Sequence, residues 1–159
     1  MTTRSDIAMD AAATAHELEL TRVFDAPREL VFACWTDPAH LAQWWGPAGY
    51  TPTGVEADAV EGGAWRFGMR DPEEGGEHWA SGVYLEVVPP ERLVFSFRWD
   101  PRENQPDEDT LVTITFADRD GKTEMTFHQS GFATVESRDG HTDGWRSAFD
   151  DLAAHVHKS

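Results

Sequence analysis

The sequence predicts an α+β fold in which a curved antiparallel sheet of about six or seven strands wraps around one long C-terminal helix. Three observations lead to this prediction. Two short helices follow the first strand directly, a run of segments with two-residue alternation comes next, and the last segment has the periodicity of a helix. Strands joined by short turns form a meandering antiparallel sheet, and an amphipathic helix must then cover its apolar face.

The first strand is expected at His16–Phe24, where apolar and charged residues alternate as they do in a half-buried strand. Its apolar residues are Leu18, Leu20 and, later, Val23. We expect residues 1–15, which are small, polar and without periodicity, to form a flexible tail before a single domain at residues 16–159.

Two short helices are expected between this strand and Gly46-Pro47. Asp25 and Asp37 can accept hydrogen bonds from the free N–H groups of a first helical turn, and Pro27 and Pro38 fit such a turn because it needs no intrahelical donor there. Apolar residues at three- and four-residue spacing form the inner faces: Leu30, Val31, Cys34 and Trp35, then Leu41, Trp44 and Trp45.

The middle of the chain is read as a series of strands separated by turn residues. The expected strands are Tyr50–Asp58, Ala64–Arg70, His78–Val88, Glu91–Trp99, Thr110–Ala117 and Lys122–Ser130. A hairpin at Asp118–Gly121 joins the last two, with Gly121 where a positive φ is tolerated. If the concave face carries the apolar set, the residues that point toward the helix are Trp65, Phe67, Met69, Leu93, Phe95, Phe97, Val112, Ile114, Phe116, Met125 and Phe127.

The C-terminal segment changes to helical spacing, with its apolar stripe at Trp145, Ala148, Phe149, Leu152, Ala153 and Val156. Thr134 can cap a helix that begins near Val135. Gly140 and Gly144 would then lie inside the helix, each at a cost of about 1 kcal/mol relative to alanine. Because these glycines share one face, they either permit close packing or leave space beneath the helix.

Composition and charge exclude several classes of partner. The chain has 159 residues, of which 40% are hydrophobic, with seven Trp and nine Phe, enough for one core or for the lining of a cavity. The net charge of -16 argues against binding nucleic acid or adsorbing to anionic lipid. The sequence has no apolar run long enough to insert into a membrane, and Cys34 is the only cysteine, so we expect a cytoplasmic protein.

Several motifs in the right order resemble the helix-grip, START-like (SRPBCC) superfamily, and within it the small bacterial proteins related to the activator of heat-shock protein 90 ATPase. The matching segments are A-P-R-E-L-V-F, W-T-D-P-A-H-L-A-Q-W-W-G-P, G-G-A-W-R-F-G-M-R, G-V-Y-L-E-V-V-P-P-E-R-L-V-F and D-G-H-T-D-G-W-R-S-A-F-D-D-L-A-A-H. The resemblance implies a sheet that grips the C-terminal helix, with a hydrophobic cavity between them. The eukaryotic co-chaperone of the family has a second domain with no counterpart in this sequence.

The pattern and the resemblance together predict a set of cavity-lining residues: Trp65, Phe67, Met69, Tyr84, Phe95, Phe97, Ile114, Phe127, His141, Trp145 and Phe149. Tyr84 and Trp79 lie on opposite parities of one strand, so only one of them points inward unless a bulge intervenes. His141 shares a helix face with Trp145 and Phe149, where it can offer a hydrogen bond to a ligand; alternatively it is a partly exposed histidine at the start of the helix.

Catalytic, metal and cofactor sites are not predicted. His155 and His157 are two residues apart on a helix, which points their rings to different faces, and His78 has no neighbouring ligand set. Cys34 lies on an apolar helix face, where a small buried residue is expected rather than a nucleophile.

Three functions remain open. The leading hypothesis is a binding protein for a small hydrophobic or aromatic molecule. The second is an enzyme of cyclase, dehydratase or isomerase type in the same cavity, with His141, Tyr84 or Arg66 as polar participants. The third is an interaction module, either a chaperone helper or a homodimer that uses exposed Trp44 and Trp45.

Overall fold

The computed structural model describes residues 16–46, 49–73, 75–101 and 107–158, so the predicted tail at residues 1–15 lies outside the described part of the chain. Its elements, in chain order, are β1 (Glu17–Phe24), α2 (Arg28–Thr36), α3 (Pro38–Trp44), β2 (Thr51–Ala57), β3 (Ala64–Arg70), β4 (Glu77–Val88), β5 (Arg92–Trp99), β6 (Thr110–Arg119), β7 (Lys122–Ser130) and α4 (Val135–Lys158).

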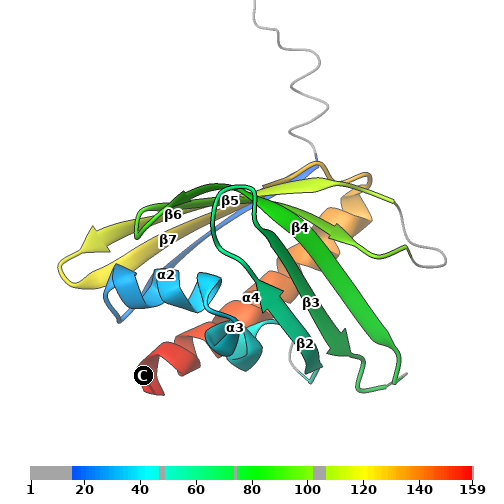
Figure 1. The fold of residues 1–159 in the computed structure, drawn as a ribbon, viewed down its shortest axis with the longest axis horizontal. Helices are drawn as coiled ribbons and strands as arrows, with labels where there is room; N and C mark the ends of the chain where they lie inside the picture. The colour runs from blue at the N-terminus through cyan, green and yellow to red at the C-terminus, as the bar shows by residue number, and fades with distance from the viewer. Residues whose placement is uncertain (1–15, 47–48, 74, 102–106, 159) are drawn as a thin grey trace, which may run out of the picture.

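The seven strands form one antiparallel sheet in the order β1-β7-β6-β5-β4-β3-β2. Figure 1 shows the sheet arching over α4, which runs along its concave side, while α2 and α3 fill the remaining space on that side. The first helix contacts β6 and β7, and α3 lies between α4 and β2. The predicted helix-grip fold, with two short helices after the first strand, is therefore confirmed.

The two short helices begin in different ways. Asp37 caps α3 as predicted, because its Oδ1 accepts from the Ala39 N–H at 2.9 Å and Pro38 takes the first helical position. The predicted cap at Asp25 is wrong. The N-cap of α2 is Pro27, which has an extended backbone and no capping side chain, and Asp25 lies two residues before this N-cap.

The concave face of the sheet carries the predicted apolar residues, and all eleven are buried. Their alternation follows the strand register, in which Phe95 lies opposite Val112 and Ile114 opposite Phe127. Val23, predicted among the apolar residues of the first strand, is not on its buried face and is 57% exposed. The inward-facing positions follow the parity of Leu18, which places Phe24 inside instead.

The predicted alternative between Tyr84 and Trp79 resolves in favour of Tyr84, which is buried on the inner side. Trp79 lies flat over Gly54 and Gly68 on the outer face, so close that a Cβ on Gly68 would come within 2.5 Å of its ring. The register shift in β4 begins after Tyr84, so it does not bring the two side chains to one face.

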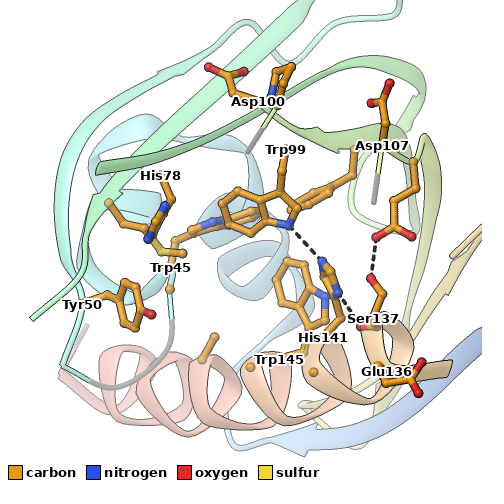
Figure 2. A pocket seen from close by; sticks show the side chains of 18 residues that line it. Trp45, Tyr50, His78, Trp99, Asp100, Asp107, Glu136, Ser137, His141 and Trp145 are labelled. Atoms are coloured by element: carbon orange, nitrogen blue, oxygen red, sulfur yellow. Dashed lines mark hydrogen bonds between the residues drawn. The ribbon is translucent and has the colours of Figure 1, made fainter. Parts of the chain in front are cut away.

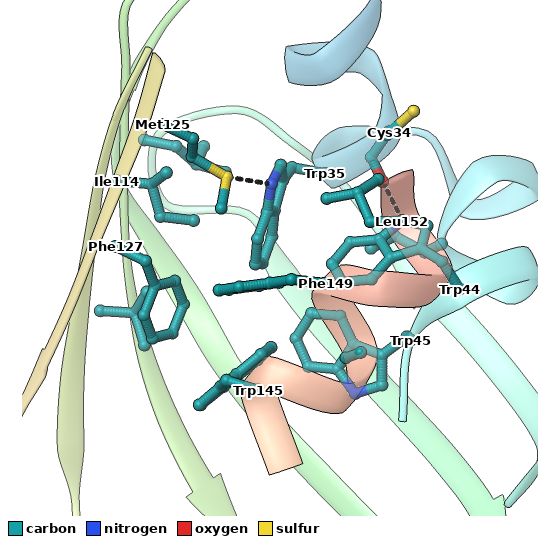
Figure 3. Close-up of a cluster of buried hydrophobic side chains, with 14 of the residues drawn as sticks. Cys34, Trp35, Trp44, Trp45, Ile114, Met125, Phe127, Trp145, Phe149 and Leu152 are labelled. Atoms are coloured by element: carbon teal, nitrogen blue, oxygen red, sulfur yellow. Dashed lines mark hydrogen bonds between the residues drawn. The ribbon is translucent and has the colours of Figure 1, made fainter. Parts of the chain in front are cut away.

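A dense aromatic core fills the space between the sheet and the C-terminal half of α4 (Figure 3). Trp35 of α2 is its centre: the indole stacks on Phe127 at 5.9 Å between ring centroids, meets Phe149 edge-on at 6.0 Å, and directs its N–H at the Met125 sulfur, 3.3 Å away. Trp44 and Trp45 join this core and are only 2% and 8% exposed. The predicted dimer surface of exposed Trp44 and Trp45 is therefore wrong, since α3 turns both rings inward.

The long helix α4 begins where the sequence predicts. The Thr134 hydroxyl accepts a hydrogen bond from the Ser137 N–H at 3.0 Å, which caps the first turn. Both Gly140 and Gly144 lie within the helix. None of the helices in the described ranges is long and apolar enough to span a lipid bilayer.

Candidate ligand-binding site

A cavity of about 400 Å³ lies between the N-terminal half of α4 and strands β3–β5. Figure 2 shows aromatic side chains from the sheet and from α4 converging on it. Its lining residues are Trp45, Gly46, Tyr50, Met69, His78, Phe97, Trp99, Asp100, Pro101, Asp107, Glu108, Glu136, Ser137, Gly140, His141, Gly144, Trp145 and Ala148. Within the described part of the chain, the wall thus combines five Trp, Phe and Tyr side chains with polar groups, four of which are carboxylates.

Small residues on one face of α4 leave this space open. Gly140, Gly144 and Ala148 recur at four-residue intervals, so they share the face that looks toward β5. A Cβ built on Gly140 would meet no atom within 4 Å. Of the two sequence-based readings of these glycines, the one that leaves space beneath the helix is correct.

Trp145 forms the boundary between the cavity and the packed core, and a buried chain of hydrogen bonds fixes its orientation. Its indole N–H donates to Gln129 Oε1 at 2.8 Å, the Gln129 amide donates to the Thr110 hydroxyl at 2.8 Å, and this hydroxyl donates to the Phe97 carbonyl at 2.8 Å. Every member has a partner, so the network is stable without water. Trp45 packs edge-on against Trp145, with 5.1 Å between ring centroids.

His141 is held in one neutral tautomer by two neighbours (Figure 2). The Ser137 carbonyl can only accept, so His141 Nδ1 carries the proton and donates over 2.7 Å. The Trp99 indole can only donate, so His141 Nε2 accepts from it over 2.9 Å. Burial lowers the pKa of His141 from its ordinary value, against the opposing effects of the Ser137 carbonyl and the Glu108 carboxylate.

Because both ring nitrogens are engaged, His141 shapes the wall and positions Trp99, and neither nitrogen is free to take a proton from a ligand. Glu108 extends the same chain of contacts. Its carboxylate accepts from the Ser137 hydroxyl and, at 2.6 Å, from the Ala133 N–H, so it ties the start of α4 to the segment before β6.

The opposite end of the cavity carries a second polar group. The Tyr50 hydroxyl donates to Asp71 Oδ2 over 3.4 Å, and His78 Nε2 lies 3.8 Å from the same oxygen. The side chains of Asp71 and His78 are only 13% and 12% exposed. Tyr50 and His78 line the cavity while Asp71 lies behind them, an arrangement that suits the orientation of a polar group on a bound molecule.

The structure distributes the eleven predicted lining residues over three places. Met69, Phe97, His141 and Trp145 line the cavity. A second, very small pocket is lined by Trp65, Phe67, Tyr84 and Phe95. The remaining three, Ile114, Phe127 and Phe149, are fully packed in the aromatic core.

Several lining residues were not predicted from the sequence, namely Trp45, Tyr50, His78, Trp99, Ser137 and Ala148. Trp45 follows α3 and Tyr50 precedes β2, so strand periodicity gives no signal for them. Trp99 continues the inward alternation of Phe95 and Phe97 in β5, so strand periodicity did offer a signal for it. Besides the predicted His141 and Trp145, the pair Gly140 and Gly144 was a further sequence signal for this end of α4.

The buried reactive groups are unsuited to covalent chemistry. Burial, with a smaller contribution from Asp37, raises the pKa of the Cys34 thiol to about 12, so a thiolate is scarce at neutral pH. Burial, followed by the charge of Asp58, likewise raises the pKa of Tyr84 to about 12. Arg66 lies over the outer Trp79 ring at 4.2 Å and pairs with Asp100 at 3.2 Å, and it does not line the cavity.

Comparison with protein families gives a match to the family described as "Activator of Hsp90 ATPase homolog 1-like protein" over residues 25–157. Comparison with curated proteins gives no match.

Solved structures with the same fold come from several bacteria. A protein of Chromobacterium violaceum is 32% identical with a TM-score of 0.82, covering 89% of this chain and 97% of that chain. A Rhodobacter sphaeroides protein is 28% identical (TM-score 0.77, covering 92% and 95%). A Silicibacter pomeroyi protein, whose description carries the same family label, is 27% identical (TM-score 0.78, covering 89% and 97%).

Proposed function

The chain belongs to the activator of Hsp90 ATPase homolog 1-like protein family, and we propose that it binds a small apolar or aromatic molecule in the cavity between α4 and the sheet. The family fold is that of a ligand-binding domain, and the finer assignment rests on the cavity. Its volume of about 400 Å³ falls within the range of roughly 300–1,000 Å³ typical of small-molecule sites. A ligand with two or three rings fits this space.

The lining favours a flat, ring-containing ligand. Trp45, Phe97 and Trp145 supply ring faces and edges on one side, and Trp99 supplies another at the mouth. Aromatic pairs contribute roughly 0.5–1.5 kcal/mol each beyond the burial of area. Trp99 and Trp145 are held in place by their hydrogen bonds, so little ordering cost accompanies binding.

The charges around the cavity favour a neutral or cationic ligand over an anionic one. Among the described residues, the wall contains no lysine or arginine but several carboxylates. Asp100 and Asp107 are paired with Arg66 and Arg98, whereas Glu136, in the first turn of α4, forms no ion pair with another described residue. An anionic head group would therefore lose hydration without gaining an ion pair.

Titration with N-phenylnaphthylamine, a neutral apolar probe that fluoresces in a dry environment, tests the proposal. We expect saturable binding of one equivalent, displaced by uncharged polycyclic compounds. Anilinonaphthalene sulfonate has the same rings and adds a sulfonate, so it is expected to bind at least about tenfold more weakly, or about 1.4 kcal/mol. Binding that never saturates, or that persists when the cavity is filled by Gly144→Leu, would reject the proposal.

A further inference from the structure

A second cluster of chemically active side chains lies away from the cavity, where α2, α3 and α4 meet. Cys34 comes from α2, His40 from α3 and His155 from the last turns of α4. Their ligand atoms all lie within 4.8 Å of one another. None of the three residues lines the cavity, so this cluster is independent of the proposed ligand site.

The geometry of the cluster is close to that of a metal centre. His40 Nδ1 faces both partners: it lies 2.8 Å from His155 Nε2 and 3.9 Å from Cys34 Sγ. With Zn–N bonds of about 2.0–2.1 Å and Zn–S bonds of about 2.3 Å, a tetrahedral ion separates two nitrogens by about 3.3 Å and a sulfur from a nitrogen by about 3.6 Å. His40 and His155 would have to separate slightly to hold an ion, and Cys34 Sγ, which lies within 4.8 Å of both imidazoles, would have to move closer to them.

We propose that Cys34, His40 and His155 bind a zinc ion. One thiolate and two neutral imidazoles form the donor set that borderline-soft divalent metals prefer, and it contains no carboxylate that would favour Mg²⁺ or Ca²⁺. Three protein ligands leave a fourth position for water or an added ligand. His40 and His155 are half-buried, so an ion has a path to the site from solvent.

Zinc binding must displace the proton of the buried Cys34 thiol, which is protonated at neutral pH in the metal-free chain. With one thiolate, bound Zn²⁺ has a net charge of about +1. Trp44 donates to the Cys34 carbonyl at 2.9 Å and holds the backbone of that residue in place. The ion would join the α2–α3 corner to α4 across more than one hundred residues of sequence and therefore stabilise the fold by mass action.

Zinc titration against a chromophoric chelator, with Mg²⁺ present in excess, tests the proposal. We expect one equivalent of Zn²⁺ per chain and a rise in the unfolding temperature. Co²⁺ in place of Zn²⁺ should give a thiolate-to-cobalt charge-transfer band, which Cys34→Ala removes. His155→Gln should weaken Zn²⁺ binding by at least about tenfold.

His157→Gln is the matched control, because His157 lies two residues further along the same helix, is exposed and does not belong to the cluster. It should leave the affinity for Zn²⁺ unchanged, and far-ultraviolet circular dichroism should show all variants folded. The proposal is overturned if wild-type protein does not bind Zn²⁺, if the cobalt complex lacks the thiolate band, or if His157→Gln and His155→Gln weaken binding equally.

Discussion

The two halves of α4 meet the same sheet but form different environments. Toward its C-terminus, Phe149 packs against Trp35 and Phe127, and Leu152 and Val156 are buried in the same hydrophobic core. Toward its N-terminus, Gly140 and Gly144 have no side chains to fill the space next to the sheet, and the cavity lies there. The size of the side chains along one continuous helix therefore decides where this fold has a packed core and where it has a cavity.

The largest effect is expected from breaking the packed half. Phe149→Ala removes a ring that is 1% exposed and contacts Trp35, Phe127 and Trp145. It should lower the free energy of unfolding by about 3–5 kcal/mol, measured by urea denaturation. Trp99→Phe in the open half should cost only about 1 kcal/mol, the value of its hydrogen bond to His141. Equal costs would mean that the two halves are not packed differently.

Filling the open half should remove binding while leaving the fold intact. Gly144→Leu adds an isobutyl group on the face that borders the cavity, and should weaken N-phenylnaphthylamine binding by at least about tenfold. Arg146→Leu adds a similar group at an exposed position of the same helix and should leave the affinity unchanged. An equal loss in both variants would point to a general disturbance of α4.

Stability measured over a series of pH values tests the contribution of His141. Its pKa is lowered in the folded state, so below its ordinary value of 6.5 the unfolded chain binds more protons than the folded one. The stability that neutral His141 contributes is thus complete above pH 6.5 and is lost as the pH falls below it. A glutamine in His141→Gln can donate to Ser137 and accept from Trp99 but does not titrate. The difference in unfolding free energy between wild type and variant, measured by urea denaturation at each pH, should therefore shrink or invert as the pH is lowered. A pH-independent difference would contradict the account.

The smallest effect is expected at Gly140. An alanine there meets no atom within 4 Å of its Cβ and replaces a glycine inside a helix. Gly140→Ala should therefore raise the free energy of unfolding by about 0.5–1 kcal/mol with little change in probe affinity. A loss of stability in thermal unfolding would mean that the space at this position is needed for packing.

The sequence predicted the architecture well because each element carries its own periodic signal. Two-residue alternation located β3 and β7 to the residue, and Thr134 and Asp37 marked the true starts of α4 and α3. The helix cap predicted at Asp25 was wrong because aspartate is also common in turns, where its side chain caps no helix.

The site was predicted only in part, because periodicity gives the face of a residue and not its partner. Phe127 shares the inner face of the sheet with Phe97, and Phe149 meets Phe127 from α4. Trp35 of α2 packs on Phe127 and Phe149, whereas Phe97 borders the cavity. The convergence of Cys34 with residues from α3 and α4 likewise depends on how three helices meet, which a pattern within one helix does not report.

The difference between the two halves can be tested directly with the indole N–H signals of ¹⁵N-labelled protein, recorded by NMR during titration with N-phenylnaphthylamine. If the open half is the binding chamber, the signals of Trp45, Trp99 and Trp145 should shift to saturation together, while those of Trp35 in the packed core and Trp79 on the outer face stay in place. Shifts confined to Trp79, or equal shifts of Trp35 and Trp99, would contradict the claim that the cavity beneath the N-terminal half of α4 holds the ligand.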